Sequence, residues 1–123
     1  MPTLSTAARN AACNAIVDLI DAGAGAGKLV IRTSGDVEVA TLTFSDPAFG
    51  NAATGVATAS AITADASATG GTAAKFTMED STAVAVLTGT VGTSGADLNL
   101  STTAISAGVI VSVSACTVTV PAS

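Results

Sequence analysis

The sequence predicts a mainly β protein: an antiparallel β-sandwich or jelly-roll-like domain that follows one N-terminal α-helix. Helical periodicity is confined to residues 4–22, whereas residues 28–120 carry short runs of Val, Thr and Ile between turn-forming residues. Six or seven short strands without intervening helices are typical of sandwiches and barrels. The length of 123 residues fits one domain, residues 1–123, with a single core.

The N-terminal segment, residues 4–22, is predicted as the helix because it is Ala-rich and has apolar residues at helical spacing. Thr3 or Ser5 can serve as its N-cap. The helix dipole disfavours Asp18 and Asp21 near the C-terminal end, so we expect packing to stabilise the helix. We expect it to end at Gly23, Gly25 and Gly27. The expected apolar stripe consists of Leu4, Ala8, Ala12 (or Ala11), Ala15, Ile16, Leu19 and Ile20.

The strands are predicted from runs of β-branched residues with a period of two. They are residues 28–33, 37–44, 56–62, 72–78, 83–91 and 109–120, with a further short strand at 97–100. The stretch 48–71 is low in complexity and has almost no charge, so it can be a loop, a weak strand or a surface that another chain covers. The alternation within 56–62 favours a strand there.

In three of these strands the apolar residues change parity. The changes follow Val39 and Val86, and a third falls between Val113 and Cys116. Such a strand is bulged, passes from one sheet to another, or is buried on both faces. The core is built of small residues with only three Phe. A domain of this size without disulfides or metal is marginal alone, so we expect a partner or a homo-oligomer.

The composition excludes most enzyme chemistry, because the chain has no His and only 11% charged residues, while 49% are hydrophobic. We therefore expect no enzymatic activity, no catalytic residue, no cofactor and no metal site. The net charge is −5, and the four basic residues, Arg9, Lys28, Arg32 and Lys75, are scattered. Nucleic acid is therefore not an expected partner.

A membrane is not an expected partner either. The mean hydropathy is high, at +0.64, but no apolar run approaches the roughly 18 residues that a spanning helix needs. The first residues do not have the pattern of a secretory signal peptide, so we expect synthesis in the cytoplasm.

Several local patterns were weighed as sites, and each favours a structural interpretation. Residues 21–29, DAGAGAGKL, suggest a phosphate loop, but Ala22 and Leu29 stand where that motif needs Gly and Ser or Thr. A flexible linker is the better interpretation. Glu79 and Asp80 favour a solvated hairpin turn over an acid–base pair.

The remaining candidate ligands are isolated along the chain. Asp36, Asp46, Asp65 and Asp97 do not have the spacing of a calcium site. Cys13 and Cys116 are predicted as buried free thiols rather than a disulfide, and neither has a basic neighbour that would activate it.

Three segments resemble small virion proteins of tailed bacteriophages and prophages, most closely head decoration (cement) proteins. They are LSTAARNAACNAIVDLIDAGAGAGKLVIRT (4–33), ATLTFSDPAFG (40–50) and LTGTVGTSGADLNLSTTAISAGVIVSVSACTVTVPAS (87–123). The resemblance implies a β-sandwich on the outer surface of the virion head. It also implies that the protein binds between subunits of the major capsid protein, often as a trimer or dimer, and reinforces the shell.

Two alternatives stay open. One is a tail, baseplate or fibre-associated virion module, and the other is an extracellular adhesin-like β-sandwich that binds a receptor or polysaccharide. The resemblance supplies no catalytic residues. The N-terminal helix, or the arm before it, is the candidate docking element.

Overall fold

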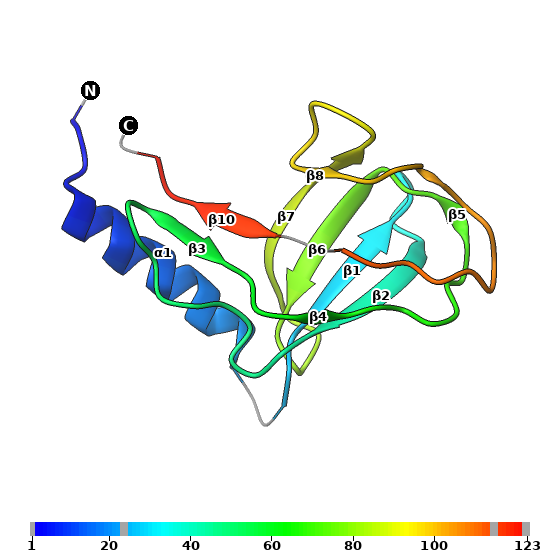
Figure 1. Cartoon of the computed structure of the whole chain (residues 1–123), viewed down its shortest axis with the longest axis horizontal. Coiled ribbons are helices and arrows are strands. Elements are labelled where there is room, and N and C mark those ends of the chain that lie inside the picture. The colour runs from blue at the N-terminus through cyan, green and yellow to red at the C-terminus, as the bar shows by residue number, and fades with distance from the viewer. Residues whose placement is uncertain (1, 23–24, 114–115, 122–123) are drawn as a thin grey trace.

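A computed structural model describes residues 2–22, 25–113 and 116–121 (Figure 1). In these ranges the chain is mainly strand with an α-helix near its N-terminus, which confirms the β-rich class and the position of the helix. The elements are α1 (Thr6–Ile20), β1 (Lys28–Arg32), β2 (Glu38–Phe44), β3 (Val56–Thr58), β4 (Ile62–Thr63), β5 (Gly71–Thr72), β6 (Lys75–Glu79), β7 (Ala85–Gly92), β8 (Leu98–Asn99), β9 (Ala104–Ile105) and β10 (Thr117–Thr119).

Helix α1 begins after Ser5, whose hydroxyl accepts a hydrogen bond from the Ala8 N–H at 3.1 Å. Of the two predicted caps, Ser5 is therefore the one used. The helix ends at Ile20, two residues before the predicted end. The backbone N–H groups of Asp21 and Ala22 turn back to the carbonyls of Asp18 and Leu19, each at 3.1 Å. This tight last turn ends the helix without a glycine.

The predicted apolar stripe of α1 is right for Ile16 and Ile20, which pack in the core, and wrong for the rest of its face. The buried side chains are Cys13, Val17 and Ile20, whereas Leu4 and Leu19 are exposed. On the buried side, Asn10 and Asn14 accept hydrogen bonds from the backbone N–H groups of Gly55 and Ala52, both at 2.8 Å. The buried face of α1 thus includes polar side chains that bond to the 52–55 loop. Hydrophobic periodicity cannot register such bonds, because they involve polar residues.

The main sheet has six strands in the order β4-β2-β1-β6-β7-β8 (Figure 1). Its neighbours are antiparallel except β7 and β8, which run parallel with Val91 beside Leu98, so the all-antiparallel prediction fails at this edge. In the pairing of β1 with β6, Leu29 lies opposite Met78 and Ile31 lies opposite Phe76. All four are buried, so this face of the sheet carries the core.

Two of the three predicted parity changes are β-bulges. The β1–β2 register jumps from Ile31 opposite Ala40 to Arg32 opposite Glu38, which leaves Val39 as the extra residue. The β6–β7 register jumps in the same way at Val86. Both Val39 and Ala40 are buried, as expected when a bulge turns consecutive side chains inward.

The third parity change separates two sheets. Val111 forms an isolated bridge with Asp65, whereas β10 pairs with β3 in a separate two-stranded sheet. The predicted continuous strand 109–120 is therefore wrong, and so is the single strand 56–62, which divides into β3 and β4. In both cases the chain leaves one partner and reaches another. A period of two records which faces are buried but not which strand lies alongside.

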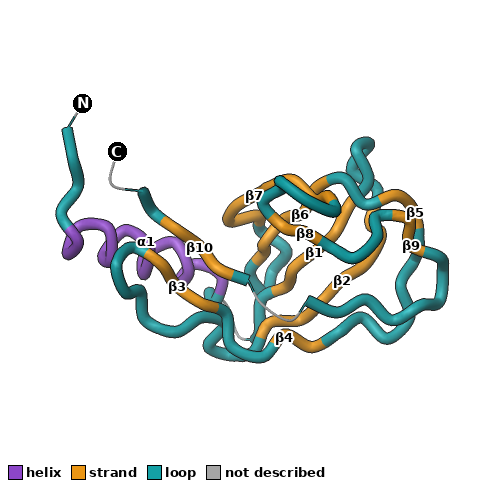
Figure 2. Tube along the Cα trace, turned by 45° about the horizontal axis from the view of Figure 1, so that its top comes forward, coloured by secondary structure: helices purple, strands orange, loops and turns teal. Residues whose placement is uncertain are grey.

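Segments after β8 run across the core-bearing face of the six-stranded sheet, and α1 with β3 and β10 lies at one end (Figures 1 and 2). Val111, Val113 and Leu98 belong to the same core cluster as Leu29 and Ile31. The second pair of short strands, β5 and β9, lies at the opposite end from α1. These covering segments contain little regular strand, and they frame the groove described next.

Candidate functional site

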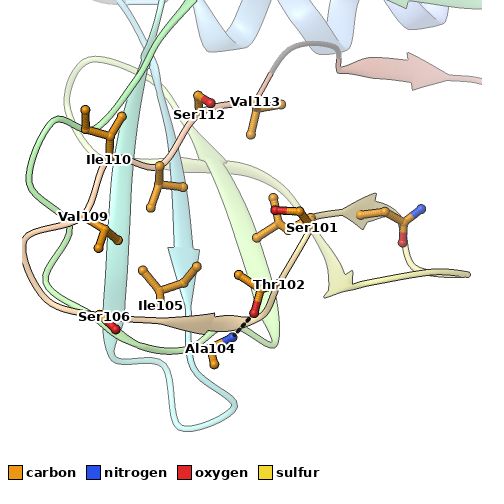
Figure 3. A pocket seen from close by; sticks show the side chains of 12 residues that line it. Ser101, Thr102, Ala104, Ile105, Ser106, Val109, Ile110, Ser112 and Val113 are labelled. Atoms are coloured by element: carbon orange, nitrogen blue, oxygen red, sulfur yellow. Dashed lines mark hydrogen bonds between the residues drawn. The ribbon is translucent and has the colours of Figure 1, made fainter.

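A groove of about 550 Å³ lies between two extended segments, residues 99–106 and 109–113 (Figure 3). None of the residues that line it is charged. In a chain with a net charge of −5, a neutral groove is suited to an uncharged partner surface. Its lining includes Leu100, Thr102, Ile105, Ile110, Ser112 and Val113.

The 109–113 side of the groove is hydrogen-bonded mainly away from the groove; its one bond to the opposite side runs from the Val109 N–H to the Ser106 carbonyl at 3.4 Å. Val111 exchanges two hydrogen bonds of 2.9 Å with Asp65, and the carbonyl of Val109 accepts one from the Ala68 N–H at 2.9 Å. In an extended chain, successive peptide groups point in opposite directions. Those of Ile110 and Ser112 therefore point toward the groove, where they bond to no other described residue.

The other side of the groove, residues 99–106, is hydrogen-bonded to β5 and to the residue after it. Ile105 and Ala104 of β9 pair with Gly71 and Thr72, and the carbonyl of Thr103 accepts a hydrogen bond from the Ala73 N–H at 2.8 Å. The Thr102 hydroxyl accepts a hydrogen bond from the Ala104 N–H at 3.2 Å, drawn as a dashed line in Figure 3. Both sides of the groove are thus hydrogen-bonded to segments that flank it, and the space between the two sides stays open.

Large apolar side chains at the rim are unusually exposed. Ile110 is 71% exposed and Val109 is 41% exposed. Single exposed apolar residues are ordinary, but two adjacent ones beside a neutral groove form a surface suited to contact with protein. No sequence motif marks this groove. Its one signal is the strand-like run at 109–113, which predicts a strand and not an open edge.

A second groove, of about 560 Å³, runs between β7 and β10. Ile16, Phe76, Met78, Leu98 and Val118 make it apolar, and Asp97 is the one charged residue in its lining. The Asp97 carboxylate accepts hydrogen bonds from the Thr90 N–H at 3.0 Å and from the Thr90 hydroxyl at 3.3 Å. This carboxylate therefore satisfies polar groups of Thr90 in β7.

Glu79 and Asp80 have separate structural tasks and do not form an acid–base pair. Glu79 is buried and receives the Arg32 guanidinium at 3.0 Å, so the prediction that it lies in a solvated turn is wrong. Asp80 does lie in the turn. Hydrogen bonds from the Thr82 hydroxyl and the Val84 N–H lower the pKa of its carboxyl group. Glu79 is the last residue of β6 and Asp80 begins the turn that follows, so the two side chains have different partners.

The isolated aspartates also act within the fold. Asp65 accepts hydrogen bonds from the backbone N–H groups of Thr41 and Ser67, at 2.9 and 3.0 Å, and Asp36 pairs with Lys75 at 3.1 Å. Within the described ranges, no three His, Cys, Asp or Glu side chains gather as metal ligands. None of the helical segments described is both long and apolar enough to traverse a membrane.

The glycine-rich linker and the cysteines have structural roles where they are described. A Cβ on Gly27 would lie 2.5 Å from the Glu79 carbonyl oxygen, so this glycine permits a close backbone approach. Gly23 and Ala24 of the predicted linker lie outside the described residues. Both cysteines are free and buried, as predicted. Burial raises the pKa of the Cys116 thiol to about 11, which keeps it protonated and unreactive.

Comparison with known proteins leaves the family undefined: no family model, no curated protein and no solved structure matches the chain.

Proposed function

We propose that this protein is a non-enzymatic decoration protein of a phage head. In this role it binds the outer surface of the virion head, bridges subunits of the major capsid protein and stabilises the shell. The resemblance of three segments to such proteins motivates the proposal. The neutral groove with exposed Ile110 and Val109 at its rim is the observation that carries it furthest. Such a surface suits contact with protein rather than with a small charged substrate.

The use of the polar side chains supports the same function. The carboxylates of Asp65, Asp80 and Asp97 accept backbone hydrogen bonds that hold loops, and Glu79 pairs with Arg32. A general acid or base needs a carboxylate that is free to face a substrate. Here these groups fix the shape of the molecule, which is the property that a structural clamp requires.

We further propose that the six-stranded sheet and the segments that cross its core-bearing face are the two layers of a β-sandwich. The burial of Val111 and Val113 in the core of the sheet supports this arrangement. A clamp of this kind binds the assembled shell and not its dissociated subunits, so it stabilises the shell by mass action. Many copies on one lattice add up to high avidity.

The deciding experiment counts the copies of the chain in the intact virion by quantitative mass spectrometry. Decoration of the whole head predicts hundreds of copies in a simple ratio to the major capsid protein. A few to a few dozen copies would instead assign the chain to the tail, baseplate or fibre. Absence from virions would favour an adhesin-like module.

A reconstitution experiment tests stabilisation directly. Heads stripped of this protein are heated with and without the purified chain, and release of DNA is followed with an intercalating dye. We expect added chain to raise the temperature of release. Stripped heads mixed with an unrelated acidic protein of similar size serve as the control, and equal release temperatures in the two mixtures would contradict the proposal.

A further inference from the structure

We propose that the groove between residues 99–106 and 109–113 accepts the N-terminal arm, residues 2–5, of a second copy of this chain as an added β-strand. The inference rests on the proposed function for the expectation that the chain self-associates. The structure supplies the acceptor, the donor and the reason why they belong to different copies.

The acceptor is the free edge of residues 109–113. This segment reads VIVSV, a strong strand-forming sequence, yet beyond the turn bond from the Val109 N–H to the Ser106 carbonyl it pairs on one side only, with residues 65–68. Ile110 and Ser112 direct their peptide groups into the groove without a partner among the described residues. An extended segment laid along this edge would receive main-chain hydrogen bonds, which is how proteins add a strand from a partner.

The donor is the arm before α1. Its four residues, Pro2 to Ser5, are all exposed, and Ser5 has the extended backbone angles φ −67° and ψ 161°. Ser5 is thus extended, as N-cap residues are, and residues 2–4 before it belong to no helix or strand of the chain. Four extended residues span about 13 Å, which matches most of the free edge at 109–113. Leu4, 44% exposed on its own copy, would bury its side chain among Leu100, Ile105 and Ile110.

Charge also favours this pairing of surfaces. The chain has a net charge of −5, so two copies repel each other over most of their surfaces. Residues 2–5 carry no charged side chain, and no charged residue lines the groove. Contact between copies is therefore least opposed where these two surfaces meet.

The donor and acceptor of one copy lie too far apart to join. The arm precedes the end of α1 that lies away from the main sheet, whereas β9, which belongs to one side of the groove, lies at the opposite end of the molecule (Figures 1 and 2). A helix of 15 residues is about 22 Å long, and the four-residue arm cannot span back over it. The arm must therefore enter another copy. Two copies that exchange arms form a two-fold dimer, and three that pass them around form a closed ring.

The first test removes the donor. Deletion of residues 2–4 leaves the Ser5 cap and the whole helix in place. For the full chain we expect a native mass, measured by light scattering after gel filtration, of two or three times 11.6 kDa. For the deletion variant we expect the mass of one chain, with an unchanged far-ultraviolet spectrum. A monomeric full chain, or an oligomer that survives the deletion, would overturn the inference.

The second test locates the contact. A Leu4→Cys chain is mixed with a Ser112→Cys chain under mild oxidation, and the matched control mixes Leu4→Cys with Val37→Cys. Val37 is 62% exposed and does not line the groove, and the native Cys13 and Cys116 are buried. We expect about 10-fold or more disulfide-linked heterodimer in the first mixture, because docking raises the effective concentration of the two thiols. Equal amounts in the two mixtures would overturn the assignment of the groove.

Both tests use the purified chain without heads, so their failure is distinct from failure of the proposed function. Heads that bind a monomeric chain would keep the decoration function and eliminate arm exchange. An arm-exchanged oligomer that is absent from virions would do the reverse.

Discussion

The six-stranded sheet and the chain that follows it, residues 100–113 and 116–119 (the crossing segment), are built from the same kinds of residues but differ in regularity. Strand β1 pairs five residues with β2 on one side and five with β6 on the other. The crossing segment contributes β9 and β10, of two and three residues, and one isolated bridge at Val111. Val- and Thr-rich sequence thus becomes a long strand where neighbours lie on both sides.

The two regions also differ in how completely they bury their apolar residues. Leu29 and Ile31 of β1 are fully buried, whereas Val113 and Val118 of the crossing segment retain 8% and 9% exposure. The centre of the sheet is therefore the most completely buried part of the core, whereas the crossing segment is buried only as far as the edge residues Val91 and Leu98, which are 8% and 7% exposed. Regions with fewer paired backbone groups open at lower free-energy cost.

The largest expected effect comes from the same substitution in each region. Leu29→Ala removes a fully buried side chain at the centre of the sheet and is expected to lower the free energy of unfolding by about 2–5 kcal/mol. Leu100→Ala removes a half-buried side chain of the crossing segment, so its loss should be less than half as large. Urea denaturation of both variants measures the difference. Equal losses would show that the crossing segment is packed as tightly as the sheet.

A smaller effect is expected from the two ion pairs of the sheet. Arg32→Met leaves the buried Glu79 carboxylate without its cation and is expected to cost about 1–3 kcal/mol. Lys75→Met breaks the exposed pair with Asp36 and should cost less than about 1 kcal/mol. Thermal unfolding at low and moderate salt compares them. If Lys75→Met proved the more costly variant, the assignment of Glu79 to the buried part of the sheet would be wrong.

The smallest expected effect is on how stability changes at low pH. Because hydrogen bonds lower the pKa of Asp80 in the folded chain, its ionised form contributes stability above the pKa of the unfolded state. That contribution is lost as the pH falls through the lower, folded pKa. Asp80→Asn should therefore show a shallower decline of the urea midpoint as the pH falls below about 4. Asp46→Asn, at an exposed position whose side chain makes no hydrogen bond to a described residue, is the matched control. Parallel declines in Asp80→Asn and in the unmodified chain would contradict this role.

Much of the fold could be predicted because its causes are local. The Ser5 cap and the Ala-rich sequence determine the start of α1, and the parity changes at Val39 and Val86 indicated the bulges. The helix face could not be predicted in the same way. Asn10 and Asn14 bond to a loop about forty residues away, and an apolar stripe gives no information on such a contact.

The candidate groove was beyond sequence reasoning for a related reason. Residues 109–113 have the composition of a core strand. From composition alone, such a segment is expected to pair with another strand on each side. In the fold, one side of this segment meets residues 65–68 and the other faces open space. Whether a strand is paired depends on which segments the topology brings alongside it.

By itself, then, the sequence determined the β-rich class, the N-terminal helix, two buried free thiols and the positions at which the buried face of β2 and β7 changes. These follow from propensity, periodicity and composition, which act within a few residues. Only the tertiary structure decided which face of α1 is buried, that Glu79 lies inside with Arg32, that β8 runs parallel to β7, and that 109–113 has a free edge. Those features depend on contacts between segments that are distant in the chain. Local sequence preferences do not determine which distant segments meet, because that depends on the loops that bring them together.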